Sequence, residues 1–339
     1  MNNKIRTTFS QLSVLTKRHL KVFFNNKMRV FYTLLVPVII FAVYVLFLRS
    51  LELNSIESFI NEKFVEYPNV IGNEEFIRYI TAGVDSWMLS GIVSLSTLTV
   101  SLQTNNIFVE DKEDGINRDF RSSPINQNVL IGSYFLYNII VTFSTCLFVC
   151  LLTLIYLAAN GEFVLTALDF LSVIGTLLVA TICSTLTTIF ICLFIKKEST
   201  LLSIIAIGAT AAGFLIGAYM PISMLPVWVQ NLCAFIPGTY TTSIIRNAYS
   251  STVFVEINET LTGLIGNYTV TTEFLTDLRY GLGYDITFFG NNVGFNFQLI
   301  AVFSFIGIFI LLNVFFGKEI TRITDGVTKI AKTARKNKK

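Results

Sequence analysis

Six long apolar stretches constrain this chain more than any other feature of its sequence. A helix needs ~20 predominantly apolar residues to cross the hydrocarbon core of a bilayer. The chain contains six runs of about that length, at 30–48, 84–104, 129–158, 170–195, 201–220 and 298–316. Only 14% of its 339 residues are charged, whereas a soluble domain carries about 25%. We therefore predict an all-α integral membrane protein with six transmembrane helices.

Lysine and arginine are distributed unevenly between the two sides of such a bundle. Twenty of the 25 lie in segments that would share one side: 1–29, 105–128, 196–200 and 317–339. The other 5 lie in 49–83 and 221–297. Cytoplasmic loops carry the excess of basic residues, so both termini are predicted to face the cytoplasm. The basic tail at 317–339 is expected to lie against anionic lipid headgroups, and nucleic acid is not an expected partner.

Residues 1–29 precede the first apolar run and carry too much charge to enter the bilayer. Apolar residues recur in them near helical spacing, with Lys17, Arg18 and Lys21 between. This pattern predicts an interfacial amphipathic helix whose basic side faces the lipid headgroups. His19, the single histidine of the chain, is interpreted as an interfacial residue.

Spans one to five occupy 30–220, and they are joined and followed by two longer outer segments. The outer loop 49–83 is mixed polar and apolar, and one or two short helices are predicted in it. The segment 221–297 begins as an apolar stretch, but Pro221, Pro226 and Pro237 are expected to divide it into pieces too short to span. We predict an outer re-entrant hairpin between spans five and six, followed by a polar external cap.

Small residues are frequent in the fifth apolar run. Gly208, Gly213 and Gly217 would permit close helix packing, and the last two form a GxxxG pair. The neighbouring helix could belong to a second subunit or to the same one, and the sequence favours neither.

The second apolar run carries a stripe of hydroxyl residues along one helical face: Ser90, Ser94, Thr97, Ser101 and Thr104. This stripe could add mild polarity to a path through the membrane, or it could pack helices together through small hydroxyl side chains. Both interpretations stay open.

Several kinds of chemistry find no support in the sequence. The phosphate-binding pattern GxxxxGK[ST] is absent, so the chain is not expected to hydrolyse ATP by that device. The apolar runs hold almost no ionisable residue, Asp85 at the outer end of the second run being the nearest case, which argues against ion-coupled transport. A single histidine makes a His-based catalytic triad improbable, and no metal site is predicted. The chain is therefore not expected to be an enzyme.

One dense cluster of charges remains, in the stretch FVEDKEDGINRDFRSSPI at 108–125. It contains 5 acidic and 3 basic residues, so the excess of bases in cytoplasmic loops does not explain it. The mixed signs fit neither a metal cage nor a phosphate site. A short helix or helical turn is predicted here, with Phe120 as its apolar anchor and Pro124 preventing its continuation into the third span.

This stretch resembles the intracellular loop of ABC transporter permeases of the type-2 exporter class. In that class, charged residues precede a glycine, and Ser/Thr-Pro follows nine residues later, as Gly115 and Pro124 do here. The interfacial basic helix, the six spans and the cytoplasmic termini extend the resemblance over the chain. Ile116-Asn117 departs from the Thr-Leu that the class more often has at this place.

The resemblance implies a permease subunit of an ATP-driven exporter. Its partners would be a second permease, identical or not, and separate cytoplasmic nucleotide-binding ATPase subunits that hold ATP and Mg; this chain would bind no cofactor. The segment 105–128 would receive the motion of the ATPases through these coupling residues: Glu110, Asp111, Glu113, Gly115, Phe120, Ser123 and Pro124.

The implied location is the bacterial cytoplasmic (plasma) membrane, and the implied substrate is a hydrophobic or amphipathic drug, lipid or peptide. The alternative is a non-transporting membrane sensor or accessory subunit whose external cap binds a ligand.

Overall fold

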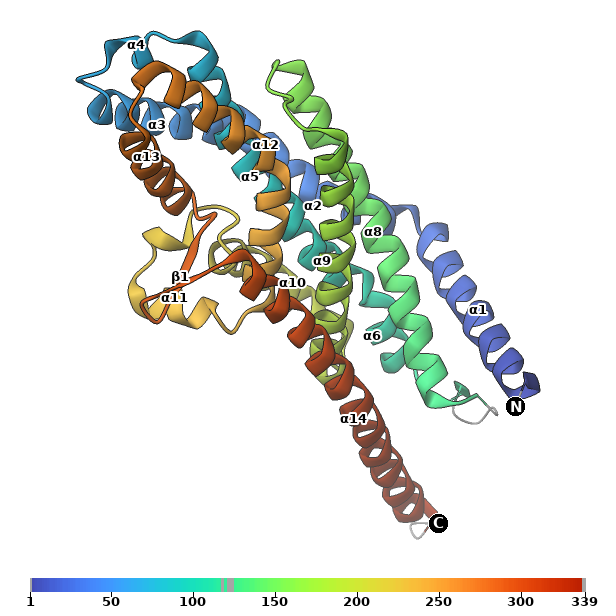
Figure 1. The fold of residues 1–339 in the computed structure, drawn as a ribbon. Coiled ribbons are helices and arrows are strands. Elements are labelled where there is room, and N and C mark those ends of the chain that lie inside the picture. The colour runs from blue at the N-terminus through green and yellow to red at the C-terminus, as the bar shows by residue number, and fades with distance from the viewer. Residues whose placement is uncertain (1, 117–118, 121–124, 337–339) are drawn as a thin grey trace.

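The structure is a computed structural model that describes residues 2–116, 119–120 and 125–336, with side chains from residue 8 to 317. Its long elements form a helical bundle with both chain ends at one end of the bundle, called the terminal end below (Figure 1). The opposite end is called the far end. The long helices are α1 (Asn2–Asn25), α2 (Lys27–Val43), α5 (Glu74–Thr104), α8 (Gln127–Ala159), α9 (Ala167–Phe194), α10 (Glu198–Leu215), α12 (Pro237–Ile265) and α14 (Phe295–Lys336). The shorter elements are η1 (Tyr44–Leu48), α3 (Arg49–Lys63), α4 (Pro68–Ile71), α6 (Asn106–Glu113), η2 (Ile222–Met224), α11 (Val227–Cys233), α13 (Tyr268–Gly281), β1 (Ile286–Phe288) and β2 (Asn291–Val293).

The all-α class is confirmed, since the only strands among the described residues form one short antiparallel hairpin. Five helical runs are long and apolar enough to cross a membrane: Lys27–Lys63, Gln127–Ala159, Ala167–Phe194, Glu198–Leu215 and Phe295–Gly317. They overlap five of the six predicted spans.

The remaining predicted span, 84–104, lies in α5, which is the most enclosed helix of the bundle. Its 31 residues would extend over roughly 46 Å, but its many Ser and Thr residues lower its hydropathy. Protein surrounds α5 on nearly all sides, and Trp87, Leu89 and Val93 are fully buried. A helix covered by other helices needs fewer apolar residues than one that faces lipid. The count of six spans therefore stays a prediction.

The N-terminal helix α1 packs against α8 at the terminal end (Figure 1). Leu15 and Phe23 of α1 join a buried cluster with Tyr134 and Tyr137 of α8. The interpretation of His19 as an interfacial residue is wrong, because its side chain is fully buried and its ring stacks on Tyr134 with the centroids 4.0 Å apart. The apolar face of α1 therefore packs against protein, in addition to any contact that it makes with a membrane.

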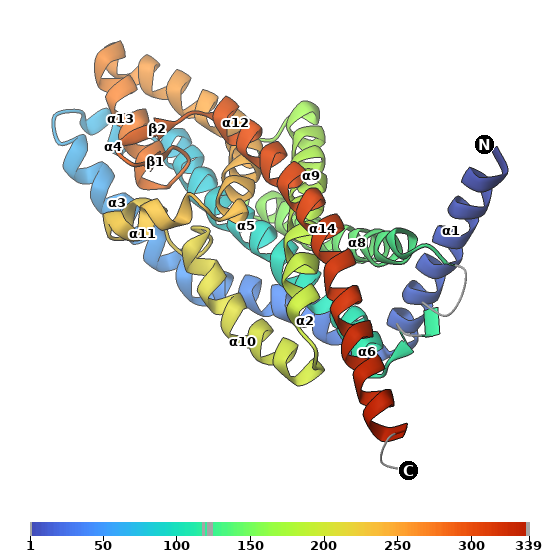
Figure 2. The ribbon, with the colours of Figure 1, turned by 90° about the horizontal axis from the view of Figure 1, so that it is seen from below.

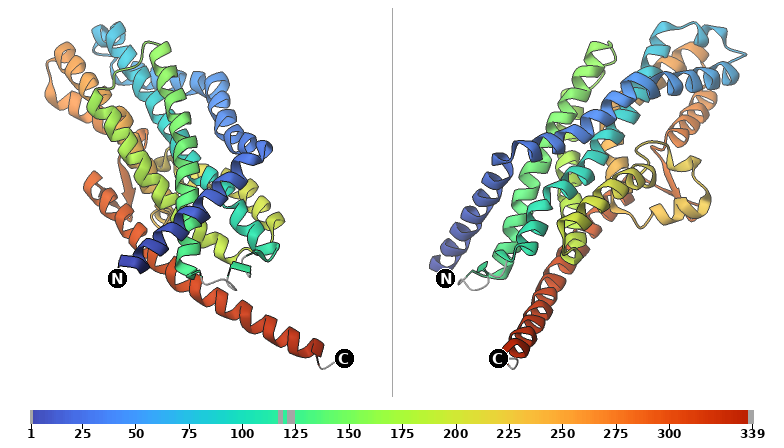
Figure 3. Two further views of the ribbon diagram at one scale, coloured as in Figure 1. Left: turned by 90° about the vertical axis from the view of Figure 1, so that its right-hand side faces the viewer. Right: turned by 180° about the vertical axis from the view of Figure 1, so that it is seen from behind.

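The first span does not end where the outer loop was expected to begin. α2 passes through the π-helical turn η1 directly into α3, so that one helical run extends from Lys27 to Lys63. Figure 3 shows α1, α2 and α3 following one another along one face of the molecule toward the far end. There α3 and α4 lie near α13 (Figure 1), so the segment 49–83 does contain short helices.

The prediction that prolines divide 221–297 into pieces too short to span is wrong for its longest element. Pro221 and Pro226 do flank the short helices η2 and α11. Pro237, however, is the first residue of α12, a helix of 29 residues. Proline suits this position because the first helical N–H has no partner within the helix. α12 packs along α5 and α9, so this part of the expected re-entrant hairpin and cap is a core helix of the bundle.

Candidate functional site

The charged cluster predicted from the sequence folds as the short helix α6 at the terminal end. α6 follows α5 after a turn at Asn105, and it contacts α1 and α10. Ile107, Phe108 and Val109 bury its apolar side in the same cluster that holds α1 against α8. The next four residues, 110–113, are all charged, and each contacts a different part of the bundle.

Asp111 makes the most buried of these contacts. Its carboxylate accepts hydrogen bonds from both terminal nitrogens of Arg18, with Nη1–Oδ2 at 2.6 Å and Nη2–Oδ1 at 2.9 Å. The hydroxyl of Tyr134 donates to the same carboxylate at 2.5 Å. Hydrogen bonding to Asp111 raises the pKa of Arg18 above its ordinary value. Asp111 therefore ties α6 to α1 and α8 through a bidentate ion pair of the stronger kind.

Glu110 and Lys112 link α6 to two further helices. Arg29 of α2 donates to Glu110 at 2.9 Å. The Lys112 ammonium donates to the carbonyl oxygens of Cys192, Leu193 and Ile195. These carbonyls lie at the C-terminal end of α9, where the helix has no partners for them and favours a positive charge.

Glu113 completes the series at the start of α10. Its carboxylate accepts a hydrogen bond from the backbone N–H of Glu198, the first residue of that helix, at 2.7 Å. The Glu198 side chain in turn accepts from Asn106 at 2.8 Å. A carboxylate at a helix N-terminus satisfies a free N–H and interacts favourably with the helix dipole. Residues 110–113 thus connect α6 to α2, to α1 and α8, to α9 and to α10.

Two of the predicted coupling residues that follow α6, Gly115 and Phe120, are described by the structure. Gly115 has a φ of +78° with no atom near its missing Cβ, so backbone conformation rather than space requires glycine there. Phe120 packs partly buried against the α1–α8 cluster, with the Arg18 guanidinium 5.2 Å from its ring centroid. Ser123 and Pro124 lie outside the described residues.

Three acidic side chains at this end are exposed: Glu113, Asp114 and Asp119. Their side chains present negative charge to solvent. We refer to these three residues as the acidic surface.

The three basic residues predicted to face lipid headgroups do not behave alike. Lys17 and Lys21 are exposed, as a basic helix surface requires. Arg18 instead turns toward the bundle and pairs with Asp111. Arg29 and Lys112 were not predicted as site residues. Their partners lie 81 and 80 to 83 residues away in the chain, so no local pattern marks them.

The three glycines predicted for close helix packing serve different purposes. Gly213 leaves room for the Tyr219 ring, since a Cβ there would lie 2.1 Å from it. Gly217 lies beyond the end of α10 with a φ of +74°, so it forms a turn and shares no helix face with Gly213. Gly208 has only its own helix close by. The GxxxG interpretation is therefore replaced by a turn that brings the chain back onto α10.

The hydroxyl stripe of α5 packs helices together within the chain. Its members are buried, and three of them bond to hydroxyls of neighbouring helices. The pairs are Ser94 with Thr242 at 2.8 Å, Thr97 with Ser184 at 2.8 Å, and Ser101 with Thr188 at 2.6 Å. These bonds join α5 to α12 and α9, so the packing interpretation holds for them.

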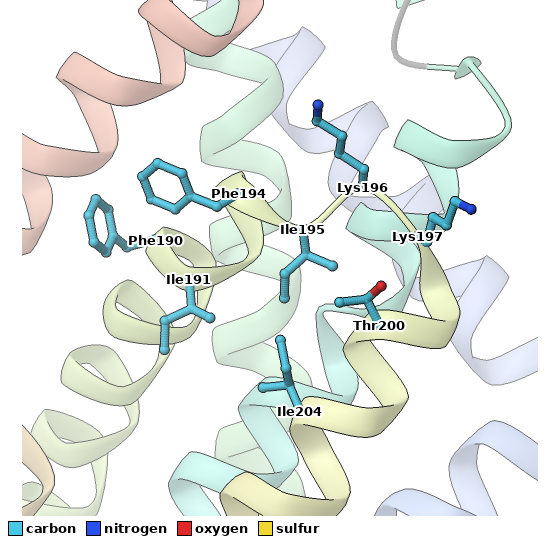
Figure 4. Close-up of a pocket in the computed structure, with 8 residues that line it drawn as sticks. All are labelled: Phe190, Ile191, Phe194, Ile195, Lys196, Lys197, Thr200 and Ile204. Carbon is cyan, nitrogen blue, oxygen red and sulfur yellow. The ribbon is translucent and has the colours of Figure 1, made fainter.

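An apolar groove lies beside this site, between the end of α9 and the start of α10 (Figure 4). Its volume is about 610 Å³. The residues that line it are Phe190, Ile191, Phe194, Ile195, Lys196, Lys197, Thr200 and Ile204. The two lysines extend away from the apolar side chains at the α9–α10 connection (Figure 4). The groove is therefore amphipathic, with its positive charge toward the terminal end.

The residues that the structure describes contain no group of three His, Cys, Asp or Glu side chains that could hold a metal ion. All five cysteines are free and buried. The arrangement can transmit motion, because the charged helix α6 is bonded to five other helices and lies next to the acidic surface.

The comparison with known families gives a clear result. The family model described as "ABC-2 type transporter" matches residues 10–249, which include α1, α6 and most of the bundle. No individual curated protein matches the chain.

Proposed function

Because the chain belongs to the ABC-2 type transporter family, as its membrane permease domain, we propose that it is the permease subunit of an ATP-driven exporter. It is an integral, multi-pass membrane protein and a transport component. ATP and Mg would be bound by separate cytoplasmic ATPase subunits, and the terminal end of the bundle would face the cytoplasm of a bacterial cell.

The observation that carries this proposal is the set of contacts made by residues 110–113. A helix bonded to five others transmits a displacement to all of them together, because ion pairs and capped helix ends resist local deformation. Arg18 and Asp111 are central, since they connect α1 to α6 while Tyr134 connects both to α8. Motion of an ATPase bound at α6 would therefore move α9 and α10 as well as the segment 105–128.

The acidic surface supports a contact with a basic groove on the ATPase. Glu113, Asp114 and Asp119 have exposed side chains, while Asp111 is buried and Phe120 is partly buried against the α1–α8 cluster. Phe120 then acts as the anchor that holds the returning chain against α1, and the exposed acids would meet the partner. Complementary charge accelerates association and selects the partner.

The substrate proposed is hydrophobic or amphipathic, such as a drug, lipid or peptide. The groove between α9 and α10 supports this class, because apolar side chains and two lysines would suit an amphipathic molecule with an acidic group. A second permease, identical or not, would complete the pathway. It would cover α10, which lies at the edge of the bundle (Figure 2) with many exposed apolar side chains, among them Leu202, Ile207 and Phe214.

Gentle purification of the tagged chain from its native membrane tests the proposal. The expected result is a co-purifying nucleotide-binding subunit with vanadate-sensitive ATP hydrolysis. Phe120→Asp should leave membrane insertion intact and abolish the stimulation of hydrolysis by transport substrate. A chain that purifies alone, without ATPase activity, under conditions that preserve other membrane complexes, would favour a sensor that binds a ligand at its far end.

A further inference from the structure

A second buried cluster of ionisable groups lies at the far end of the bundle, away from α6. It contains Asp85 of α5, Glu162 of the α8–α9 connection, Arg49 at the start of α3 and Tyr44 of the π-helical turn η1. Asp85 is fully buried, and the Glu162 side chain is 6% exposed. These four residues come from segments that no local sequence pattern brings together.

The two carboxyl groups share a single guanidinium. Arg49 donates from Nε to Asp85 Oδ2 at 2.9 Å and from Nη2 to Glu162 Oε1 at 2.6 Å. Tyr44 donates its hydroxyl proton to Asp85 at 2.5 Å. With both carboxyls ionised, the cluster would hold two negative charges and one positive charge, since the phenol is neutral. A buried excess charge is costly, and such groups take up a proton instead.

One atom of this cluster lacks a partner. Glu162 Oε2 is buried without a hydrogen-bond donor, while its other carboxyl oxygen and the Asp85 carboxylate are both bound by Arg49. Two carboxylates accept hydrogen bonds and donate none, so they can bond to each other only when one of them carries a proton. That proton would satisfy Oε2 and remove the excess charge at once.

We propose that Asp85 and Glu162 form a proton-binding site at the far end of the bundle, with one proton held between the two carboxyls. Arg49 positions both groups, and Tyr44 holds Asp85 from the other side. The ligand is the proton itself, and the site is independent of the ATPase-coupling function proposed for α6.

The surroundings of Glu162 favour its protonated form. Burial is the largest cause that raises the pKa of Glu162, to about 8, and the nearby charge of Asp85 raises it further, whereas Arg49 opposes them. Charged and titratable groups face the pair from each packed element: Tyr44 from η1, Arg49 from α3 and Tyr156 from α8. Asp169 of α9, the next carboxyl along the chain, is occupied with Ser251 and Thr252 of α12.

The site lies where η1, α5 and the α8–α9 connection meet, so its proton affects how these segments are held together. η1 is a π-helical turn, a departure from α-helix that recurs at functional positions, and it joins the first span to α3. The proton therefore helps to hold this junction, α5 and the α8–α9 connection together. Its loss at higher pH leaves two carboxylates competing for Arg49, and the α8–α9 connection, 160–166, should loosen.

Infrared difference spectroscopy on the purified full-length chain tests the site. Ordinary carboxyl groups, with pKa values near 4, stay ionised between about pH 6 and about pH 10. A carbonyl-stretch band of a protonated carboxyl should nevertheless be present at the lower pH and disappear toward the higher. Glu162→Gln should abolish the band, and Asp85→Asn should shift its loss to lower pH because the neighbouring negative charge is gone. Glu66→Gln, at an exposed glutamate of the same end, should leave the band unchanged.

Two outcomes would overturn the proposal. The first is the absence of any titrating carboxyl band in the wild-type chain over this range, a result that needs no variant to fold. The second is a band that persists unchanged in Glu162→Gln and Asp85→Asn. Hydrogen exchange of residues 160–166 provides a second readout: its rate, corrected for intrinsic pH dependence, should rise with pH in wild type and stay level in Glu162→Gln.

Discussion

Arg18 and Asp111 lie 93 residues apart in the chain, and their side chains form a bidentate ion pair with N–O distances of 2.6 and 2.9 Å. This pair connects the N-terminal helix to the charged helix α6. Together with the Tyr134 hydroxyl, it ties α1 and α6 to α8.

Removing the Arg18 guanidinium should destabilise the terminal end. Arg18→Gln leaves the buried Asp111 carboxylate with Tyr134 as a remaining donor, and hydrogen bonds to charged groups contribute about 1.5 to 3 kcal/mol each. We expect the free energy of unfolding in detergent to fall by at least the contribution of one such bond, about 1.5 to 3 kcal/mol. Lys17→Gln removes the same charge from the exposed neighbouring residue and should change it little. Equal losses in both variants would show that helix charge, and not the pair, is responsible.

Lys112 should hold the end of α9 in place. Lys112→Met keeps the length of the side chain but removes the donor to the carbonyls of Cys192, Leu193 and Ile195. Residues 192–197 should then exchange their amide hydrogens faster, which mass spectrometry can measure. The control is Lys196→Met, at an exposed lysine of the same connection, and it should exchange as wild type does. Unchanged protection in Lys112→Met would contradict this role.

The positive φ of Gly115 alone should decide which residues can replace it. Its φ is +78° and nothing lies within 4 Å of a Cβ built there. A left-handed conformation costs most residues roughly 1 to 2 kcal/mol, but asparagine adopts it more readily. Gly115→Asn should therefore retain substrate-stimulated ATP hydrolysis in the purified complex, and Gly115→Val should lose most of it. Full activity of the valine variant would exclude a required turn at this position.

His19 should make the chain sensitive to acid. Burial, and then the charge of Arg18, lowers the pKa of His19 from 6.5 to about 4. The unfolded chain thus binds a proton that the folded chain does not, so stability is fully present above pH 6.5 and falls as the pH drops toward 4. The full loss amounts to roughly 3 kcal/mol at 1.36 kcal/mol per pKa unit.

Thermal unfolding of His19→Gln against wild type across this range measures that effect. The variant should lose the part of the pH dependence that lies between pH 6.5 and 4, because glutamine does not titrate. Identical pH profiles for the two chains would assign the acid sensitivity to other groups.

The long apolar helices were predictable because the length of an apolar run is a local property of the sequence. Five predicted spans overlap the run formed by α2, η1 and α3, and the helices α8, α9, α10 and α14, whose length and composition suit a bilayer. α12 was missed because its buried side is rich in polar and aromatic residues such as Tyr249 and Arg246, which resemble an exposed segment. Pro237 also indicated a break, although it begins the helix.

The position of the candidate site in the chain was predictable from the sequence. The partners of its charged side chains were not. A dense charged cluster between two apolar runs marks α6 without any structure. The partners of its charges, Arg18, Arg29 and the end of α9, lie 80 or more residues away along the chain. Only the packing of α1 against α8 brings Arg18 to Asp111, and that packing leaves no periodic signal around either residue.

Photo-crosslinking from position 119 shows whether an ATPase contacts the segment that follows α6. A crosslinking amino acid in place of the exposed Asp119 would be activated in native membranes, with the exposed Val65 at the far end as control position. We expect an adduct between position 119 and a nucleotide-binding ATPase, altered in yield by ATP, and none from position 65. An intact, active complex in which position 119 never crosslinks to an ATPase would contradict the assignment of α6 as the coupling element.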